Sequence, residues 1–373
     1  MLYIVMKRIF IVVVCIVSGM SFSFAQNDWV NQYTLAQEAF NAGNLENATA
    51  MGKQCLDNYM KQSGEIGTNY RSILRLLSTI AFESSNFEEG IEYSKKEISV
   101  LEQMASPKDL TYAGALYNLG LMYRQLDNNE EAQNNLAETL SIYLLYYSPN
   151  DEEVVNCKWK LATVKTSLGL KDEAATLFDE AFTAFGNPEE ITPDYLQACY
   201  YYGSLLVEIG KNSEAVTYLN NVKTIYEDND YQDSDEYMSV VATMANAYRQ
   251  IDKVKAEELF ALATEKFKST NSVNSTEYAN LVNNRAVNLQ ALGKSSEAEA
   301  LLTEMGGGSA NEGTVDVSSL NNLAALSQQR GDNKKAEELY LQAIELVEDK
   351  TSSSYAEVLE NLAVLYSNTG KLE

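Results

Sequence analysis

The residues of this chain that could do chemistry are mostly carboxylates. The sequence holds 53 aspartates and glutamates against 28 lysines and arginines, a formal net charge of −25, and it contains no histidine. Without histidine, nucleophilic hydrolysis lacks its usual general base. Carboxylate pairs such as Glu88-Glu89 and Glu337-Glu338 recur, but acid–base catalysis needs two carboxyl groups in one cleft with separated pKa values. No pair is singled out in that way, so the sequence predicts no enzymatic activity.

The motifs that come nearest to a cofactor site each lack a required residue. The acidic stretch from Glu227 to Glu236 has neither the central glycine nor the final glutamate of a helix-loop-helix calcium site. The glycine-rich stretch 306–313 lacks the Lys-Ser/Thr of a phosphate-binding loop. We therefore interpret both as linkers and expect no metal and no cofactor. The acidic surface also makes nucleic acid a poor partner, because it repels phosphate backbones.

Three cysteines lie beyond the first 25 residues: Cys55, Cys157 and Cys199. An odd number with no close pair indicates neither a disulfide framework nor a zinc cluster. Each cysteine falls at apolar spacing within an expected helix, which favours buried packing. A bridge between Cys157 and Cys199, on neighbouring helices of successive repeats, stays open as an alternative.

Small residues recur about every 42 residues, and this period indicates the secondary structure on which the residues above lie. Apolar residues within one repeat, such as Leu116, Leu119 and Tyr123, have helical spacing, and Asp127 or a glycine breaks the pattern in mid-repeat. Two columns of small residues mark close approaches between helices: Ala48, Gly90, Ala132, Ala174, Ala215, Ala256, Ala298 and Ala336, and then Ala36, Ser78, Gly120, Ala162, Gly203, Ala245, Ala286, Ala324 and Ala363. Each repeat is thus predicted to be an antiparallel helix pair that buries its apolar face against neighbouring pairs.

The second helix of the repeat carries a family resemblance. Its Ala-x-x-x-bulky-x-x-Ala pattern, as in Ala174, Phe178 and Ala181, resembles the tetratricopeptide repeat. That repeat is ordinarily about 34 residues long, and the longer period here resembles that of kinesin light chains and of many secreted bacterial proteins. The resemblance implies an all-α, right-handed superhelical solenoid of antiparallel helix pairs. We expect residues 26–373 to form about eight full pairs and a truncated ninth.

The resemblance also implies a binding site. In solenoids of this family the first helix of each pair lines the concave side, and asparagines there hold the backbone of an extended peptide. Aromatic residues on this face could supply contact area, and basic residues could hold a carboxylate. The candidate site residues are Arg75, Tyr117, Asn118, Arg124, Trp159, Lys160, Tyr200, Tyr201, Asn246, Arg249, Asn284, Asn322 and Asn361. The same face carries Asn280, Asn283 and Asn321, and plain packing between helices is the alternative role for its aromatic residues.

Residues 1–25 are expected to be a secretory signal peptide. Lys7-Arg8 precede the apolar run 9–17, and Ser23-Phe24-Ala25 supplies small residues before a cut at Gln26. The remaining chain is expected to be exported, either to the periplasm or out of the cell, and to insert into no membrane.

Three functions follow from these observations. The leading prediction is an exported, non-enzymatic scaffold that binds a peptide or protein segment in its concave groove. The alternative is the amino-terminal interaction array of a larger secreted protein, because secreted chains with this repeat often continue into another domain, such as a caspase-like CHAT domain. The third is a structural assembly piece whose uncovered end stacks on another copy.

Some positions depart from the repeat. Gly52 and Ser94 stand where most repeats carry a bulky residue, so we expect weak packing in the first two pairs. Arg285 stands in a column otherwise filled by leucine or methionine, and the sequence offers no reason for it. The printed chain reaches only the start of a ninth pair, which is expected to leave the helix over residues 355–368 half covered. Both ends are therefore expected to be less stable than the middle.

Overall fold

The computed structural model describes residues 28–104, 108–186, 191–270, 275–307 and 317–371, which form α-helices joined by short turns. No β-strand occurs in these residues, which confirms the all-α repeat architecture. The chain divides into two compact units, Met1–Ala198 and Cys199–Glu373. The expected signal peptide over residues 1–25 and most of the glycine-rich segment 306–313 lie outside the described residues.

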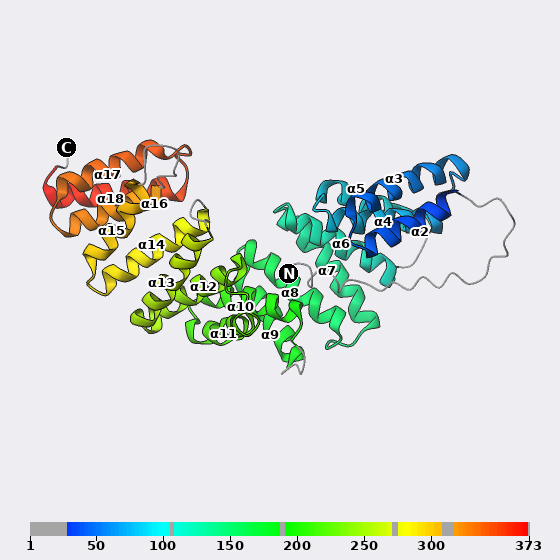
Figure 1. Ribbon diagram of the computed structural model, residues 1–373, viewed down its shortest axis with the longest axis horizontal. Helices are drawn as coiled ribbons and strands as arrows, with labels where there is room; N and C mark the ends of the chain where they lie inside the picture. Colours follow the sequence, from blue (N-terminus) through cyan, green and yellow to red (C-terminus); the bar gives the residue numbers. More distant parts are fainter. Residues whose placement is uncertain (1–27, 105–107, 187–190, 271–274, 308–316, 372–373) are drawn as a thin grey trace. The chain divides into compact units, whose positions relative to one another are not determined.

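The first unit consists of helix pairs stacked in chain order (Figure 1). Its helices are α2 (Asp28–Asn41), α3 (Leu45–Gln62), α4 (Thr68–Glu83), α5 (Phe87–Gln103), α6 (Leu110–Gln125), α7 (Asn129–Tyr146), α8 (Glu152–Ser167) and α9 (Lys171–Phe185). Within a pair the two helices pack together, and α3, α5 and α7 also pack against the first helix of the next pair. Helix α10 (Pro193–Glu208) follows, and the boundary between the two units falls inside it.

The second unit repeats this arrangement. Its helices are α11 (Asn212–Asp228), α12 (Asp235–Ile251), α13 (Lys253–Ser269), α14 (Thr276–Ala291), α15 (Ser295–Gly307), α16 (Val317–Gln329), α17 (Asn333–Leu346) and α18 (Ser353–Thr369). Helix α12 pairs with α13, α14 with α15, and α16 with α17, and α18 packs against both α16 and α17.

The columns of small residues lie where helices approach most closely. Ala132, Ala174 and Ala215 are fully buried, as predicted. At Gly120 a Cβ atom would lie 2.9 Å from Cγ of Leu136, and at Gly203 it would lie 2.7 Å from Cγ of Leu219. Both distances are shorter than a carbon–carbon contact allows. The facing leucine occupies the space of a side chain, so a residue larger than glycine would require that leucine to move.

The breaks in the pattern are helix ends with left-handed backbone. Gly169 has a φ angle of 76°, and Asp127, which replaces glycine in its repeat, has a φ angle of 56°. An aspartate tolerates this conformation better than most residues. The predicted turns between the two helices of a pair are therefore confirmed at these positions.

The expectation of weak packing at Gly52 and Ser94 is wrong. A Cβ atom on Gly52 would lie 2.8 Å from Cδ2 of Leu77, so that leucine already fills the space of a side chain. Ser94 is buried, and its hydroxyl lies 2.6 Å from the hydroxyl of Ser78 on the facing helix. Neighbouring side chains thus compensate for the small residues in these pairs: Leu77 occupies the space beside Gly52, and Ser78 bonds Ser94.

Arg285 of α14 is explained by an ion pair with the preceding helix. Its Nε donates to Oε1 of Glu257 on α13 at 2.8 Å, and both side chains are largely buried. The amide of Asn288 donates to the backbone oxygen of Lys253 at 3.0 Å in the same region. A charged column residue is tolerated in this repeat because the facing helix supplies its counter-charge.

Replacing Arg285 by leucine should lower the free energy of unfolding by about 1–3 kcal/mol, although leucine matches the column, because the largely buried Glu257 loses its charged partner. The double variant Arg285→Leu/Glu257→Leu should recover most of that loss. Urea unfolding followed by circular dichroism measures both. A single variant as stable as the wild type would contradict the assignment.

Helix α18 exposes two large apolar side chains to solvent. Leu359 and Val364 are 40% and 48% exposed. Leu320 of α16, which holds the same place in its repeat as Leu359, is buried against the cluster that contains Tyr340 of α17. In the described residues, α18 therefore exposes at Leu359 a position that α16 packs against α17.

Candidate functional site

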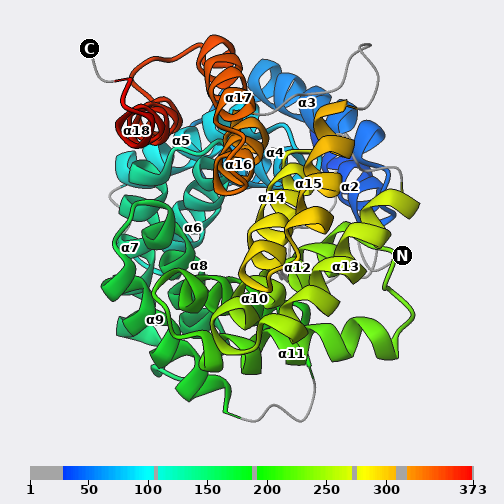
Figure 2. The ribbon, with the colours of Figure 1, turned by 90° about the vertical axis from the view of Figure 1, so that its left-hand side faces the viewer.

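The candidate residues lie mainly on the first helices of the pairs, and these helices are neighbours in space. In the first unit α2 contacts α4 and α4 contacts α6. In the second unit α12, α14, α16 and α18 contact one another in that order, and Figure 2 shows α12, α14 and α16 following one another, each beside its partner helix. Each unit therefore has a row of first helices on which the candidate side chains are placed, and the two rows are described separately.

In the first unit both aromatic candidates are part of the core. Trp159 of α8 is 0% exposed, and its indole Nε1 donates to Oδ1 of Asn156 at 3.0 Å. Tyr117 of α6 is buried, and its ring centroid lies 6.4 Å from that of Tyr143. Burial is also the main cause of the pKa of Tyr117 being well above its usual value. These side chains fill space between helices, in line with the packing alternative for the aromatic residues.

Lys160 is also buried, and it has a carboxylate partner. Its ammonium lies 2.7 Å from Oδ1 of Asp194 in the first turn of α10 and 4.0 Å from the centre of the Trp159 ring. Burial lowers the pKa of Lys160 even though Asp194 favours the charged form. The charge of Lys160 therefore ties α8 to the beginning of α10, where a carboxylate is also stabilised by the helix dipole.

The remaining candidates of the first unit are half-buried: Arg75 of α4, and Asn118 and Arg124 of α6. The guanidinium of Arg75 extends over Gly114 of α6, since a Cβ atom on that glycine would lie 2.8 Å from its NH2. This first row thus combines a packed centre with partly accessible basic groups.

In the second unit the asparagines form hydrogen-bonded links from helix to helix. Oδ1 of Asn283 on α14 accepts from Asn322 Nδ2 and Ser319 Oγ of α16, at 3.2 and 3.1 Å. Nδ2 of Asn361 on α18 donates to Oδ1 of Asn321 at 3.0 Å. Asn283 and Asn321 were outside the predicted site set, although they lie beside the predicted column. Periodicity places these residues on one face but cannot tell which amide pairs with which.

The row continues to Arg249 of α12. Its NH1 donates to Oδ1 of Asn284 at 3.2 Å, and the side chain is half-buried, which lowers the pKa of Arg249. The other arginines of this unit, Arg285 and Arg330, both have carboxylate partners, whereas the ion pairs found in the described residues include none for Arg249. A guanidinium with an amide as its neighbour keeps donors that suit an added carboxylate.

One turn before Arg249, Asn246 carries a buried acceptor. Its Oδ1 is enclosed and has no hydrogen-bond partner in the described part of the chain. A buried polar atom without a partner is costly. Rotating this amide toward a ligand would therefore break no hydrogen bond of that oxygen, so Asn246 and Arg249 both have polar groups that could bind a ligand.

Tyr200 and Tyr201 lie at the α10 end of the second unit. Both are half-buried, and their rings meet edge to face with centroids 5.5 Å apart. Burial raises the pKa of Tyr200. Unlike Trp159, these rings keep some accessible surface, so they are the aromatic candidates that a ligand can reach.

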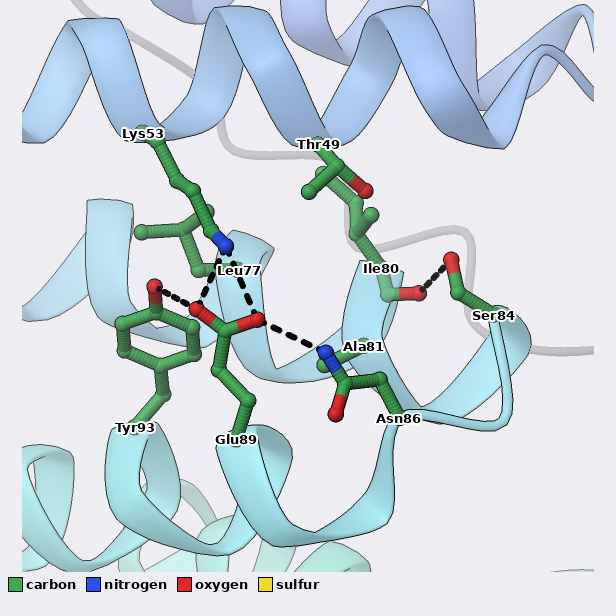
Figure 3. Close-up of a pocket in the computed structure, with 9 residues that line it drawn as sticks. All are labelled: Thr49, Lys53, Leu77, Ile80, Ala81, Ser84, Asn86, Glu89 and Tyr93. Carbon is green, nitrogen blue, oxygen red and sulfur yellow. Dashed lines mark hydrogen bonds and ion pairs between the residues drawn. The ribbon is translucent and has the colours of Figure 1, made fainter.

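A small polar hollow lies between α3, α4 and α5 (Figure 3). The carboxylate of Glu89 at its centre receives hydrogen bonds from Lys53, Asn86 and Tyr93 at 2.8–2.9 Å. Although burial works against ionisation, these bonds hold the pKa of Glu89 below its usual range. Thr49 and Ser84 in the wall donate to backbone oxygens of their own helices. The polar groups of the hollow are thus bonded within the protein, either to one another or to the backbone of their own helix.

The cysteines and the acidic stretch 227–236 are not among the candidate residues of the two first-helix rows. Cys55, Cys157 and Cys199 are buried thiols, and none of them is part of a disulfide in this structure. In the acidic stretch, Glu227 bonds Lys223 and Tyr237, and Asp233 pairs with Lys266. In the part of the chain that the structure describes, no three metal-ligating side chains of His, Cys, Asp or Glu gather in one place.

None of the described helices is both long and apolar enough to cross a bilayer.

Comparison with known proteins identifies the repeat. Two tetratricopeptide-repeat family models match the chain, one over residues 111–186 and another over residues 317–349. A search of curated proteins found no match. The chain contains tetratricopeptide repeats, and its helix pairs form a helical scaffold of the kind that serves protein interaction.

One solved structure among the matches supports the fold, and two others are similar to a lower degree. The apo form of the quorum sensor NprR from B. thuringiensis is 14% identical, with a TM-score of 0.56, over 91% of this chain and 86% of that one. A tetratricopeptide repeat protein from Parabacteroides merdae is 14% identical over 91% and 98% of the two chains, with a TM-score of 0.47. A putative kinesin light chain from Podosopora anserina with nearly identical TPR-like repeats is 15% identical over 55% and 97%, with a TM-score of 0.47. At 14% identity the likeness to NprR concerns the fold alone.

Proposed function

We propose that this protein is an exported, non-enzymatic scaffold that binds an extended peptide or protein segment along the first-helix row of its second unit. The observation that carries the proposal is the row of amides on α14, α16 and α18 that leads to Arg249 on α12. An amide offers both a donor and an acceptor, which is what the backbone of an extended segment requires.

The charge of the row indicates the kind of segment. The chain has a formal net charge of −25, so most of its surface disfavours an acidic ligand. At Arg249 a half-buried guanidinium and the amide of Asn284 lie together. A carboxylate of the ligand, from an acidic side chain or the carboxyl terminus, would meet its donors there. Tyr200 and Tyr201 would add apolar contact area.

The test is binding of synthetic peptides in which a free carboxyl terminus is compared with an amide, measured by calorimetry at two salt concentrations. We expect the free acids to bind more tightly, and Arg249→Met to weaken binding about tenfold or more, since a lost charge-assisted hydrogen bond is worth about 1.5–3 kcal/mol. Arg330→Met is the matched control, because Arg330 belongs to the same unit but pairs with Glu299. Equal affinity of the Arg249 and Arg330 variants would overturn the role of Arg249, and absence of binding by the whole peptide set would overturn the proposed site.

Export is a separate part of the proposal and rests on the sequence of residues 1–25. Its support is the order of a basic pair, an apolar run and small residues before Gln26. Expression of the full chain with a carboxyl-terminal tag, followed by fractionation and mass determination, should give a product beginning near Gln26 outside the cytoplasm. Full-length product in the cytoplasm would contradict export and leave the binding proposal unaffected.

A further inference from the structure

A buried carboxyl group lies in the first unit, apart from the proposed binding row. Glu97 of α5 is 1% exposed, and its Oε1 has no hydrogen-bond partner within the described residues. A carboxylate is costly to bury without partners, whereas the protonated acid is buried at much lower cost. Glu97 is therefore held where its protonation state affects packing.

The positive charges near Glu97 come from the facing helix. Arg71 and Arg75 of α4 both act on its carboxyl group, and both are half-buried. Arg75 also reaches α6, where Gly114 leaves room for its guanidinium, since a Cβ atom there would lie 2.8 Å from NH2. The cluster thus lies where α4, α5 and α6 meet.

Three other ionisable pairs lie on α5 and the helices packed against it. On α6, Tyr112 donates to Glu102 at 3.4 Å, and the ring of Tyr123 lies 5.7 Å from the ammonium of Lys95. On α3, Lys53 pairs with Glu89, two turns before Glu97. The charges that act on Glu97 are those of Arg75 and Arg71.

We propose that Glu97 is a proton-operated switch at the joint between α4, α5 and α6: taking up a proton tightens this joint, and losing the proton loosens it. The protonated acid fits the buried site. The ionised carboxylate would attract water or an arginine, because its Oε1 has no hydrogen-bond partner within the described residues. Because the joint connects the second and third helix pairs, the switch changes how firmly the first unit holds together.

The direction follows from linkage. Burial raises the pKa of Glu97 to about 7, although Arg75 and Arg71 oppose the rise. An unfolded glutamate has a pKa of about 4.3, so the folded chain binds this proton more strongly than the unfolded chain does. The stabilisation from this group is complete below the unfolded pKa and is lost as the pH rises through about 7.

The test is amide hydrogen exchange of the full chain between pH 5.5 and 8.5, with rates corrected for the intrinsic pH dependence. In the wild type, protection of amides in α4, α5 and α6 should fall about tenfold or more across this range, since one unit of pKa shift corresponds to a factor of ten. Glu97→Gln, which imitates the protonated acid, should keep its protection nearly constant. Glu92→Gln, an exposed change on the same helix, should behave like the wild type.

A direct measurement guards against a variant that merely folds differently. In protein labelled with ¹³C at the glutamate carboxyl carbons, one signal should titrate with a midpoint near pH 7 and should be missing in Glu97→Gln. Parallel exchange profiles of the wild type and Glu97→Gln, or a Glu97 signal that titrates near pH 4–5, would overturn the proposal.

Discussion

Replacing Lys160 by glutamate should destabilise the first unit by about 3–5 kcal/mol, the cost of breaking a buried ion pair and leaving a charge uncompensated. The new carboxylate would occupy a site that is almost closed to solvent and that already holds Asp194, 2.7 Å from the present ammonium. It would also lose the contact of the ammonium with the face of the Trp159 ring. Denaturant unfolding followed by circular dichroism should show this loss as a shift of the first unit to lower denaturant concentration.

Two further variants separate charge from packing at this site. Lys160→Met keeps an unbranched side chain and should cost less, because Asp194 retains some access to solvent. Exchanging the charges in Lys160→Glu/Asp194→Lys should restore part of the stability that Lys160→Glu loses. If Lys160→Glu were as stable as the wild type but impaired in peptide binding, Lys160 would instead belong to a ligand site, as its position on the first helix of a pair predicts.

The helix pairs could be predicted from the sequence because their cause is local and repeated. A small residue at Ala132, Ala174 or Ala215 has one physical reason, the close approach of two helices, and that reason recurs at every repeat. The turns are equally local, since a left-handed backbone at Gly169 or Asp127 depends on the residue itself. Agreement of many repeats in register then leaves little freedom for another fold.

The site was harder to predict because a first helix in this array is enclosed on several sides. In α8, nearly every residue from Val154 to Val164 is buried, including Lys158, Lys160 and Thr163. Helical periodicity separates an inner face from an outer one when a helix has one packed side. The two faces can no longer be distinguished by periodicity when the helix also packs against helices of neighbouring repeats. Trp159 and Lys160 therefore have the spacing expected of groove residues but lie in the core.

The sequence also could not predict which residues pair across successive repeats. Lys160 binds a carboxylate 34 positions later, Arg285 one 28 positions earlier, and Asn361 an amide 40 positions earlier. Each sequence separation is close to the length of one repeat or of part of one. The period therefore limits which positions a partner can occupy, but it does not identify the partner residue. Side-chain length and the turn geometry of both helices make that selection, and neither is visible in one sequence.

Trp159→Ala should lower the free energy of unfolding of the first unit by about 3–5 kcal/mol, the range for removing a large aromatic residue from a core. The indole is fully enclosed and donates to Asn156, so its removal leaves a cavity and a lost hydrogen bond together. Trp159→Phe should cost less because it refills most of that space. Measuring unfolding and peptide binding on the same preparations separates core from contact: a core residue lowers stability in both variants and leaves the affinity of the folded fraction nearly unchanged. Normal stability of Trp159→Ala combined with a loss of affinity of about 2 kcal/mol would show that the ring is a binding hot spot, and would move the binding site from Arg249 toward the first unit.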